Sequence, residues 1–93
     1  MYIIWVYDIN TEDKKGQRRL RRIFKLSKQY LFHIQCSVFE GEITKAKLEK
    51  LKYEAKKIID EKHDSLIIFK SRNQRWLDKE IIGIEKADTD SFI

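Results

Sequence analysis

The chain has 93 residues, 20 Lys and Arg against 15 Asp and Glu, and a formal net charge of +5. This length leaves room for a single domain, because a second hydrophobic core could not be buried in what remains. One cysteine excludes a disulfide framework and a cysteine-rich metal site, and it favours the reducing cytoplasm. The longest apolar runs, at residues 2–7 and 66–69, are too short to span a membrane, and no signal peptide is expected.

The first two predicted elements are a strand and a helix. Residues 2–7 are β-branched and aromatic, which favours a strand, and Asp8 stands at its end. Asn10 and Thr11 are expected to cap a helix that enters near residues 12–15 and continues to about residue 30. Apolar residues recur on one face of this helix at i, i+3 and i+4 spacing, which indicates that this face is buried.

The predicted first helix concentrates the positive charge of the chain. Residues 14–28 carry eight cations, no acidic residue occurs in 14–39, and the rest of the chain sums to −3. A basic patch on a slightly acidic body indicates a polyanionic partner, although a solvated helix face is the alternative. Arg19 lies at the border of the buried face, where it either passes the core edge or points into a cleft. The exposed stripe consists of Arg18, Arg21, Arg22, Lys25 and Lys28.

The remaining elements complete an α+β pattern. Residues 31–41 form either two short strands with a turn near Gln35 and Cys36, or one bulged strand. Thr44 is expected to cap a helix over 45–61, which is followed by a strand over 64–70 and a short final strand over 80–84. The domain then spans 1–84, with a poorly ordered tail over 85–93. The order β-α-β-β-α-β plus one strand predicts a ferredoxin-like sandwich with both helices on one sheet face.

Two of the predicted strands suggest that a second copy is needed. An antiparallel sheet with one solvated face alternates polar and apolar residues, but residues 2–7 and 66–69 do not alternate. Both faces of these strands are apolar, so the face that the helices leave open must also be covered. We therefore expect a homodimer.

Four side chains have two competing interpretations. Asp8 is either a metal ligand facing the basic helix or a cap for the turn into that helix. Phe39 either packs in the core or stacks on nucleic-acid bases. Tyr7 alternates with Asp8 and is expected in the core, and His33, among apolar neighbours, is expected to be structural rather than a general base.

From residue 1 to about residue 70 the chain resembles a known family. The resemblance rests on the strand ending in Tyr7-Asp8, the arginine-rich helix, the stretch Ile-Gln-Cys-Ser-Val-Phe-Glu-Gly at 34–41, and the strand opening at Asp64-Ser65. Together these features resemble the small CRISPR-associated protein of the spacer-acquisition step, the second in the numbered Cas series, also called the CRISPR-associated endoribonuclease family. His33 stands where relatives often carry arginine, so no phosphate-binding role is carried over to it.

The resemblance implies a ferredoxin-like homodimer with Mg²⁺-dependent phosphodiesterase activity on RNA or DNA, acting in spacer acquisition with the CRISPR integrase. It implies that Asp8 is the metal ligand, and it associates Arg19, Arg21 and Phe39 with activity. Because one carboxylate supplies too few ligands for a magnesium site, two Asp8 side chains at a dimer axis are expected to share the ion. Two other functions stay open: a non-catalytic scaffold that grips duplex DNA in the integration complex, and a toxin-like ribonuclease of the same fold.

Overall fold

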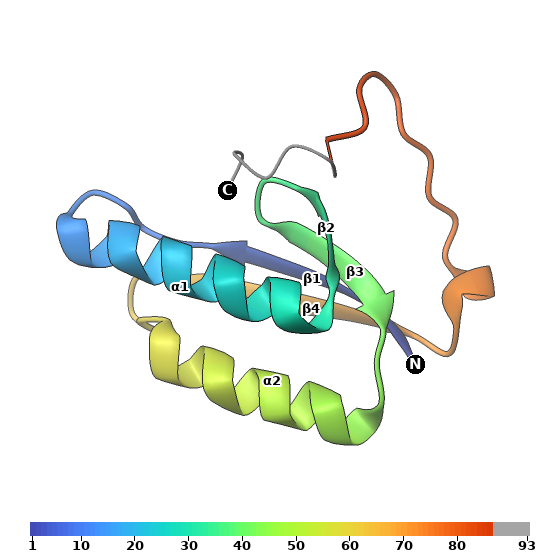
Figure 1. Ribbon diagram of the computed structural model, residues 1–93, viewed down its shortest axis with the longest axis horizontal. Helices are drawn as coiled ribbons and strands as arrows, with labels where there is room; N and C mark the ends of the chain where they lie inside the picture. The colour runs from blue at the N-terminus through green and yellow to red at the C-terminus, as the bar shows by residue number, and fades with distance from the viewer. Residues whose placement is uncertain (87–93) are drawn as a thin grey trace.

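Four strands and two helices alternate as β-α-β-β-α-β in the computed structural model, which describes residues 1–86 (Figure 1). This order confirms the predicted ferredoxin-like α+β arrangement. Among residues 1–86, no helix has the length and apolar character needed to cross a membrane. The elements are β1 (Tyr2–Asp8), α1 (Lys14–Tyr30), β2 (Phe32–Gln35), β3 (Val38–Glu42), α2 (Lys45–Ile58), β4 (Ser65–Ser71) and a short 3-10 helix (Gln74–Trp76).

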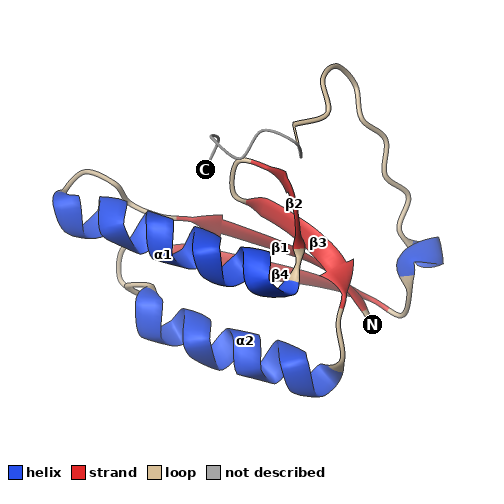
Figure 2. Cartoon of the chain, in the orientation of Figure 1, coloured by secondary structure: helices blue, strands red, loops and turns tan. Residues whose placement is uncertain are grey.

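The strands form one antiparallel sheet in the order β2-β3-β1-β4, so β1 is central. It pairs with β4 along its whole length, from Tyr2 opposite Ser71 to Asp8 opposite Ser65. Both helices cover the same face of this sheet (Figures 1 and 2). β2 and β4 are therefore the two edges, and one broad face has no helix over it.

The core lies between the sheet and the helices. Ile3, Trp5 and Tyr7 alternate along β1 and point to the helices, where they are buried. The Trp5 indole Nε1 donates to Ser27 Oγ at 3.0 Å, and Ser27 Oγ donates to the Ile23 carbonyl at 2.7 Å. This buried pair fixes α1 on the sheet and satisfies the one polar atom of the tryptophan.

The face without helices is apolar and exposed. Ile4 and Val6 of β1 lie on this face, opposite Phe69 and Ile67 of β4. Phe69 is 57% exposed and Ile67 is 51% exposed, and on β2 Phe32 is 76% exposed. The expected lack of polar alternation is confirmed, and we call this surface the open face. Glu40 of β3 separates Phe32 from Ile4 on this face, but the side chains of β1 and β4 form an exposed apolar patch, which marks an interaction site rather than a solvated sheet.

The capping residue of α1 and the end of α2 differ from the sequence expectation. Asp13 caps α1, its Oδ1 accepting from the Gly16 amide at 2.8 Å, whereas Asn10 Oδ1 accepts from Glu12 N at 3.0 Å in the preceding turn. The expected caps at Asn10 and Thr11 were therefore wrong, because the chain makes one further turn before the helix. Thr44 caps α2 as expected, and α2 ends at Ile58 rather than residue 61.

The stretch 31–41 is two strands, not one. β2 and β3 are joined at Cys36, whose φ of 40° is the left-handed conformation of a tight turn. The pairing shifts register between His33 and Gln35, so a bulge accompanies the turn. Of the two alternatives that the sequence left open, the hairpin is the observed one.

The final strand expected over 80–84 does not form in the single chain. After the 3-10 helix, residues 77–86 run without strand pairing and away from β4 (Figure 1). Lys79 contacts the Glu40 carboxylate, but Ile82 and Ile84 remain 92% and 79% exposed. A strand exists only through pairing with another backbone, and this segment meets neither edge of its own sheet in register. The rest of the expected tail, 87–93, lies outside the described residues.

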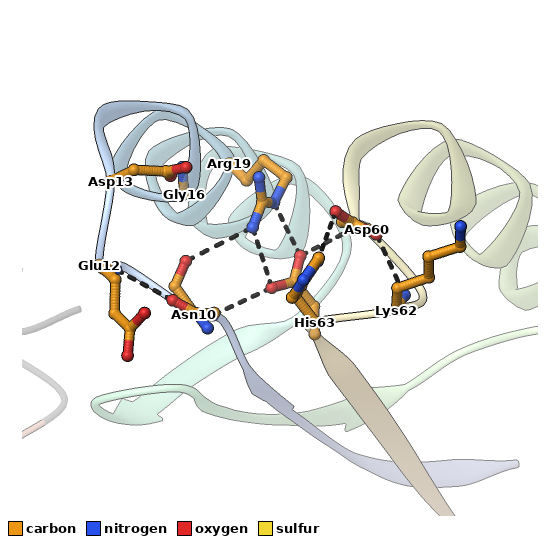
Figure 3. Close-up of polar contacts among 9 residues, drawn as sticks. Asn10, Glu12, Asp13, Gly16, Arg19, Asp60, Lys62 and His63 are labelled. Carbon is orange, nitrogen blue, oxygen red and sulfur yellow. Dashed lines mark hydrogen bonds and ion pairs between the residues drawn. The ribbon is translucent and has the colours of Figure 1, made fainter.

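A buried carboxylate, Asp64, connects four segments of the chain. The Asp64 side chain is fully buried and accepts from Arg19 Nε at 2.8 Å and Nη2 at 3.2 Å (Figure 3). It also accepts from the backbone amides of Asn10 at 2.9 Å and Asp60 at 2.8 Å. We call these four residues the Asp64 clamp. It ties α1, the loop after β1, the end of α2 and the start of β4.

The clamp sets the ionisation of Asp64 and Arg19. Burial opposes the charge on Asp64, but the hydrogen bonds from Arg19 and the two amides outweigh burial and hold its pKa below the usual value. The hydrogen bond to Asp64 correspondingly raises the pKa of Arg19. Asp64 is therefore a carboxylate, and the clamp is charged, at neutral pH.

Stability should fall on acidification as the clamp is protonated. Because the folded-state pKa of Asp64 lies below its unfolded value of about 3.9, its contribution is present above that pH and is lost as the pH falls through the folded value. We expect thermal unfolding between pH 7 and pH 2.5 to show a loss below about pH 4 that is smaller in Asp64→Asn. Equal acid sensitivity in both proteins would assign the loss to other carboxylates.

Candidate nucleic-acid interface and metal ligand

Asp8 ends β1 on the open face. It shares the parity of Ile4 and Val6, so its side chain points away from the helices, and it is exposed. Within residues 1–86 its carboxylate makes no hydrogen bond or ion pair. The turn into α1 is capped by Asp13 and Asn10 instead. The interpretation of Asp8 as a turn cap was therefore wrong, and its carboxylate is free to bind a ligand.

A single chain does not provide a complete metal site. Among the described residues, no group of three or more His, Cys, Asp and Glu side chains could hold an ion. Mg²⁺ prefers octahedral oxygen ligands, keeps several waters, and uses only one or two carboxylates. An exposed carboxylate without a protein partner fits that demand, provided that a second ligand comes from outside the chain. The apolar face that carries Asp8 is the surface on which a second copy would supply it.

Arg19 lies in a different place from Asp8. Its guanidinium donates to Asp64 and, through Nη2, to the Asn10 carbonyl at 3.4 Å, on the helix side of the sheet. The polar cavity that it lines also contains Asp60 and His63, but not Asp8. The structure therefore does not bring Asp8 and Arg19 together within one chain. Of the two positions that the sequence left open for Arg19, the structure shows the second, in which its side chain points into a cleft.

The other predicted cations lie on the outer surface of α1. Five side chains are exposed there, and none has an acidic neighbour within the helix: Arg18, Arg21, Arg22, Lys25 and Lys28. Lys28 Nζ also lies 5.5 Å from the ring centroid of Phe24, over the aromatic face. The predicted basic stripe is present as a surface feature.

Sequence reasoning missed the contribution of α2. This helix adds six lysines and two glutamates on the same side of the sheet, and a groove between the helices is lined by Arg22, Lys25 and Lys50. The two helices together hold fourteen cations and two carboxylates, a net charge of +12, while the rest of the chain sums to −7. We call this surface the helix layer. The net charge of α2, +4, was hidden in the sequence because it was counted together with the acidic rest of the chain, which offsets it.

Phe39 is not available to stack on a base. It is fully buried on the helix-facing side of β3, opposite Trp5 and His33. Its ring centroid lies 6.0 Å from that of Tyr7 and 5.7 Å from that of Phe24. The expectation that Phe39 belongs to the nucleic-acid-binding set was therefore wrong, because strand parity places it in the core. Tyr7 is also buried, as expected, and burial raises the pKa of its phenol.

The two histidines are structural. His33 is buried between Phe24 and Phe39, with Nε2 2.9 Å from the Cys36 carbonyl, so it stabilises the hairpin turn. His63 is exposed, and its Nδ1 lies 2.9 Å from Asp60 Oδ2. This hydrogen bond is the main cause of the lowered pKa of Asp60. Within residues 1–86 neither histidine forms a hydrogen bond with Asp8.

Comparison with known proteins places the chain in a family. The family model described as CRISPR associated protein Cas2 matches residues 1–79. A protein of Fusobacterium nucleatum named CRISPR-associated endoribonuclease Cas2 is 52% identical over 93 residues, covering 100% of this chain and 87% of that protein.

Solved structures similar to this chain carry the same family name as its sequence relatives. Streptococcus pyogenes Cas2, crystallised at pH 6.5, aligns with a TM-score of 0.73 and 38% identity, covering 86% of this chain and 99% of that one. A second crystal structure, titled only as Cas2, aligns with a TM-score of 0.74 and 39% identity over 100% of this chain and 98% of that one. With the fold, the full-length coverage and the match over residues 1–79 in agreement, this chain belongs to the CRISPR associated protein Cas2 family.

Proposed function

We propose that this protein is a homodimeric, Mg²⁺-dependent endoribonuclease that acts in CRISPR spacer acquisition, with Asp8 as the metal ligand. One observation carries the proposal: Asp8 is an exposed carboxylate without a partner among residues 1–86, at the end of the central strand and on the apolar open face. Relatives at up to 52% identity are named endoribonucleases, which favours RNA as the substrate. The single cysteine supports the cytoplasm as the proposed place of action.

Dimerisation through the open face would complete the metal site. In an isologous dimer the same surface is used by both copies, so burying the open face brings a second Asp8 to the same interface. The exposed isoleucines of residues 77–86 are apolar and unpaired in the single chain, which suits a segment that adds to the sheet edge of a partner.

The chemistry divides between the metal ligand and the cations. A bound Mg²⁺ polarises a phosphoryl oxygen and lowers the pKa of a coordinated water. Asp8 of each chain would hold the ion, and cations of the helix layer would bind flanking phosphates and orient the strand. Arg21 is exposed in the helix layer and available to bind a flanking phosphate, whereas Arg19 is held by the clamp.

A scaffold role is the second candidate, and the position of the charge favours it. The helix layer and Asp8 lie on opposite faces of the sheet, so nucleic acid bound on the helices of one chain does not approach the Asp8 of that chain. Such a dimer would grip duplex DNA in the spacer-integration complex, beside the CRISPR integrase, without cleaving it. Membership of a CRISPR-associated family makes the toxin-like ribonuclease the weakest of the three interpretations.

The open face should hold the dimer together. Phe69→Lys places a charge on that face and should give a folded monomer, because residue 69 is already 57% exposed in the single chain. Tyr53→Lys, on the opposite helix layer and 62% exposed, is the matched control and should stay dimeric. Sedimentation at micromolar concentration measures both. A wild-type protein that sediments as a stable monomer would contradict the dimer.

Nucleic-acid binding should be strongly salt-dependent through the helix layer. Replacing Arg18, Arg22 and Lys25 together with Gln should reduce the slope of log K against log[salt] by about 0.9 for each phosphate of duplex DNA that the protein no longer neutralises. A matched triple replacement of Lys70, Arg72 and Arg75 removes the same charge elsewhere and should leave the slope nearly unchanged. Equal slopes in the two triple variants would show that α1 does not contact the nucleic acid.

Replacing Asp8 distinguishes the nuclease role from the scaffold role. Asp8→Asn keeps the size of the side chain but removes the charge that a hard cation requires, so it should abolish Mg²⁺-dependent cleavage of labelled RNA while leaving folding, dimerisation and affinity intact. Activity that survives in the variant, or in excess chelator, would place cleavage elsewhere. Tight binding of duplex DNA by a wild type that cleaves nothing would favour the scaffold.

A further inference from the structure

The direction of the Asp8 carboxylate is set by its backbone alone. Within residues 1–86 no side chain or amide holds it, so any precision at a metal site must come from the main chain on either side. On the N-terminal side this is ordinary strand pairing, with Tyr7 opposite Leu66 and Asp8 opposite Ser65. The ladder ends there, so the C-terminal side needs another support.

The Asp64 clamp supplies that support. Asn10, two residues after Asp8, donates its amide to Asp64 Oδ1 at 2.9 Å and receives Arg19 Nη2 on its carbonyl at 3.4 Å (Figure 3). Both polar groups of the Asn10 backbone are therefore held by side chains. Asp64 itself precedes Ser65, the strand partner of Asp8, so the clamp fixes both strands at the point where their pairing stops.

A glycine keeps the same loop close to α1. A Cβ at Gly16 would lie 1.9 Å from the Asn10 carbonyl oxygen, so the helix backbone reaches the loop only because this residue has no side chain. Asp13 then caps the helix from within the loop. The segment after Asp8 is thus held by Asp64, which directly precedes β4, and by Arg19 and Gly16 of α1.

We propose that Asp64 and Arg19 are positioning residues for Asp8, acting through the backbone of Asn10, and that Arg19 does not contact the substrate. This inference rests on the proposed role of Asp8 as metal ligand. A buried ion pair is weak evidence for added stability, and supports of this kind around a ligand typically change metal affinity or activity 10–100-fold when removed. Arg19 and Asp64 then form one unit, distinct from the exposed Arg21.

The first test is the metal dependence of cleavage. Asp64→Asn, Arg19→Gln and the double variant should each raise the Mg²⁺ concentration for half-maximal cleavage by about 10-fold or more. The double variant should match the single variants, because the two residues act as a unit. Leu48→Ala truncates a fully buried side chain at the far end of α2, and it should shift that concentration less than about twofold. Arg19→Lys is the milder variant if the others do not fold.

The second test needs no catalysis. Amide hydrogen exchange and NMR shifts of Ile9 and Asn10 should change in the clamp variants and not in Leu48→Ala, and added Mn²⁺ should broaden the Asp8 and Ile9 signals less than in wild type. Unchanged metal dependence in folded clamp variants, or unchanged Ile9 and Asn10 amides, would overturn the positioning role. If Asp8→Asn retains full activity, the proposed function fails, while the Ile9 and Asn10 amides still decide whether the clamp positions this segment.

Discussion

Covering only one face of the sheet is the constraint on which the other features of this molecule depend. Both helices pack on the side that carries Ile3, Trp5 and Tyr7, and that side holds the core. Burial of this face stabilises the chain, but it leaves Ile4, Val6, Ile67 and Phe69 of β1 and β4 without cover. A small domain buries a limited fraction of its surface, so an uncovered apolar face of this extent is better explained by association than by solvation.

The same asymmetry separates the functional chemistry. The helix layer concentrates a net charge of +12, while the carboxylate best placed for a metal lies on the opposite, apolar face. In one chain the two cannot act on the same phosphate. A nuclease mechanism therefore requires the substrate strand to reach the end of β1, at the edge of the proposed dimer interface. A binding role requires only the helix layer. One chain therefore carries the whole cationic surface that the proposed polyanion binding would use, but only one carboxylate of the proposed metal site.

The Asp64 clamp connects the fold to the candidate site. It substitutes for strand pairing where the β1–β4 ladder ends, and it joins the loop after Asp8 to α1 and α2. Arginine suits this position because its planar fork contacts both carboxylate oxygens while a further contact reaches the Asn10 carbonyl. An arginine that is important for activity need not touch the substrate if it holds the chain that carries the metal ligand.

The sequence determined the element order, the ferredoxin-like class, the basic first helix, the apolar open face and the candidacy of Asp8, because these follow from local periodicity and from charge counted along the chain. Only tertiary structure decided the partners of particular side chains. Arg19 forms an ion pair with Asp64, forty-five positions away in the sequence. The alternation of side chains along β3 places Phe39 in the core. α2 and α1 lie side by side and together form one cationic surface. The strand expected over 80–84 did not form, because a strand depends on a neighbouring backbone that its own sequence does not supply.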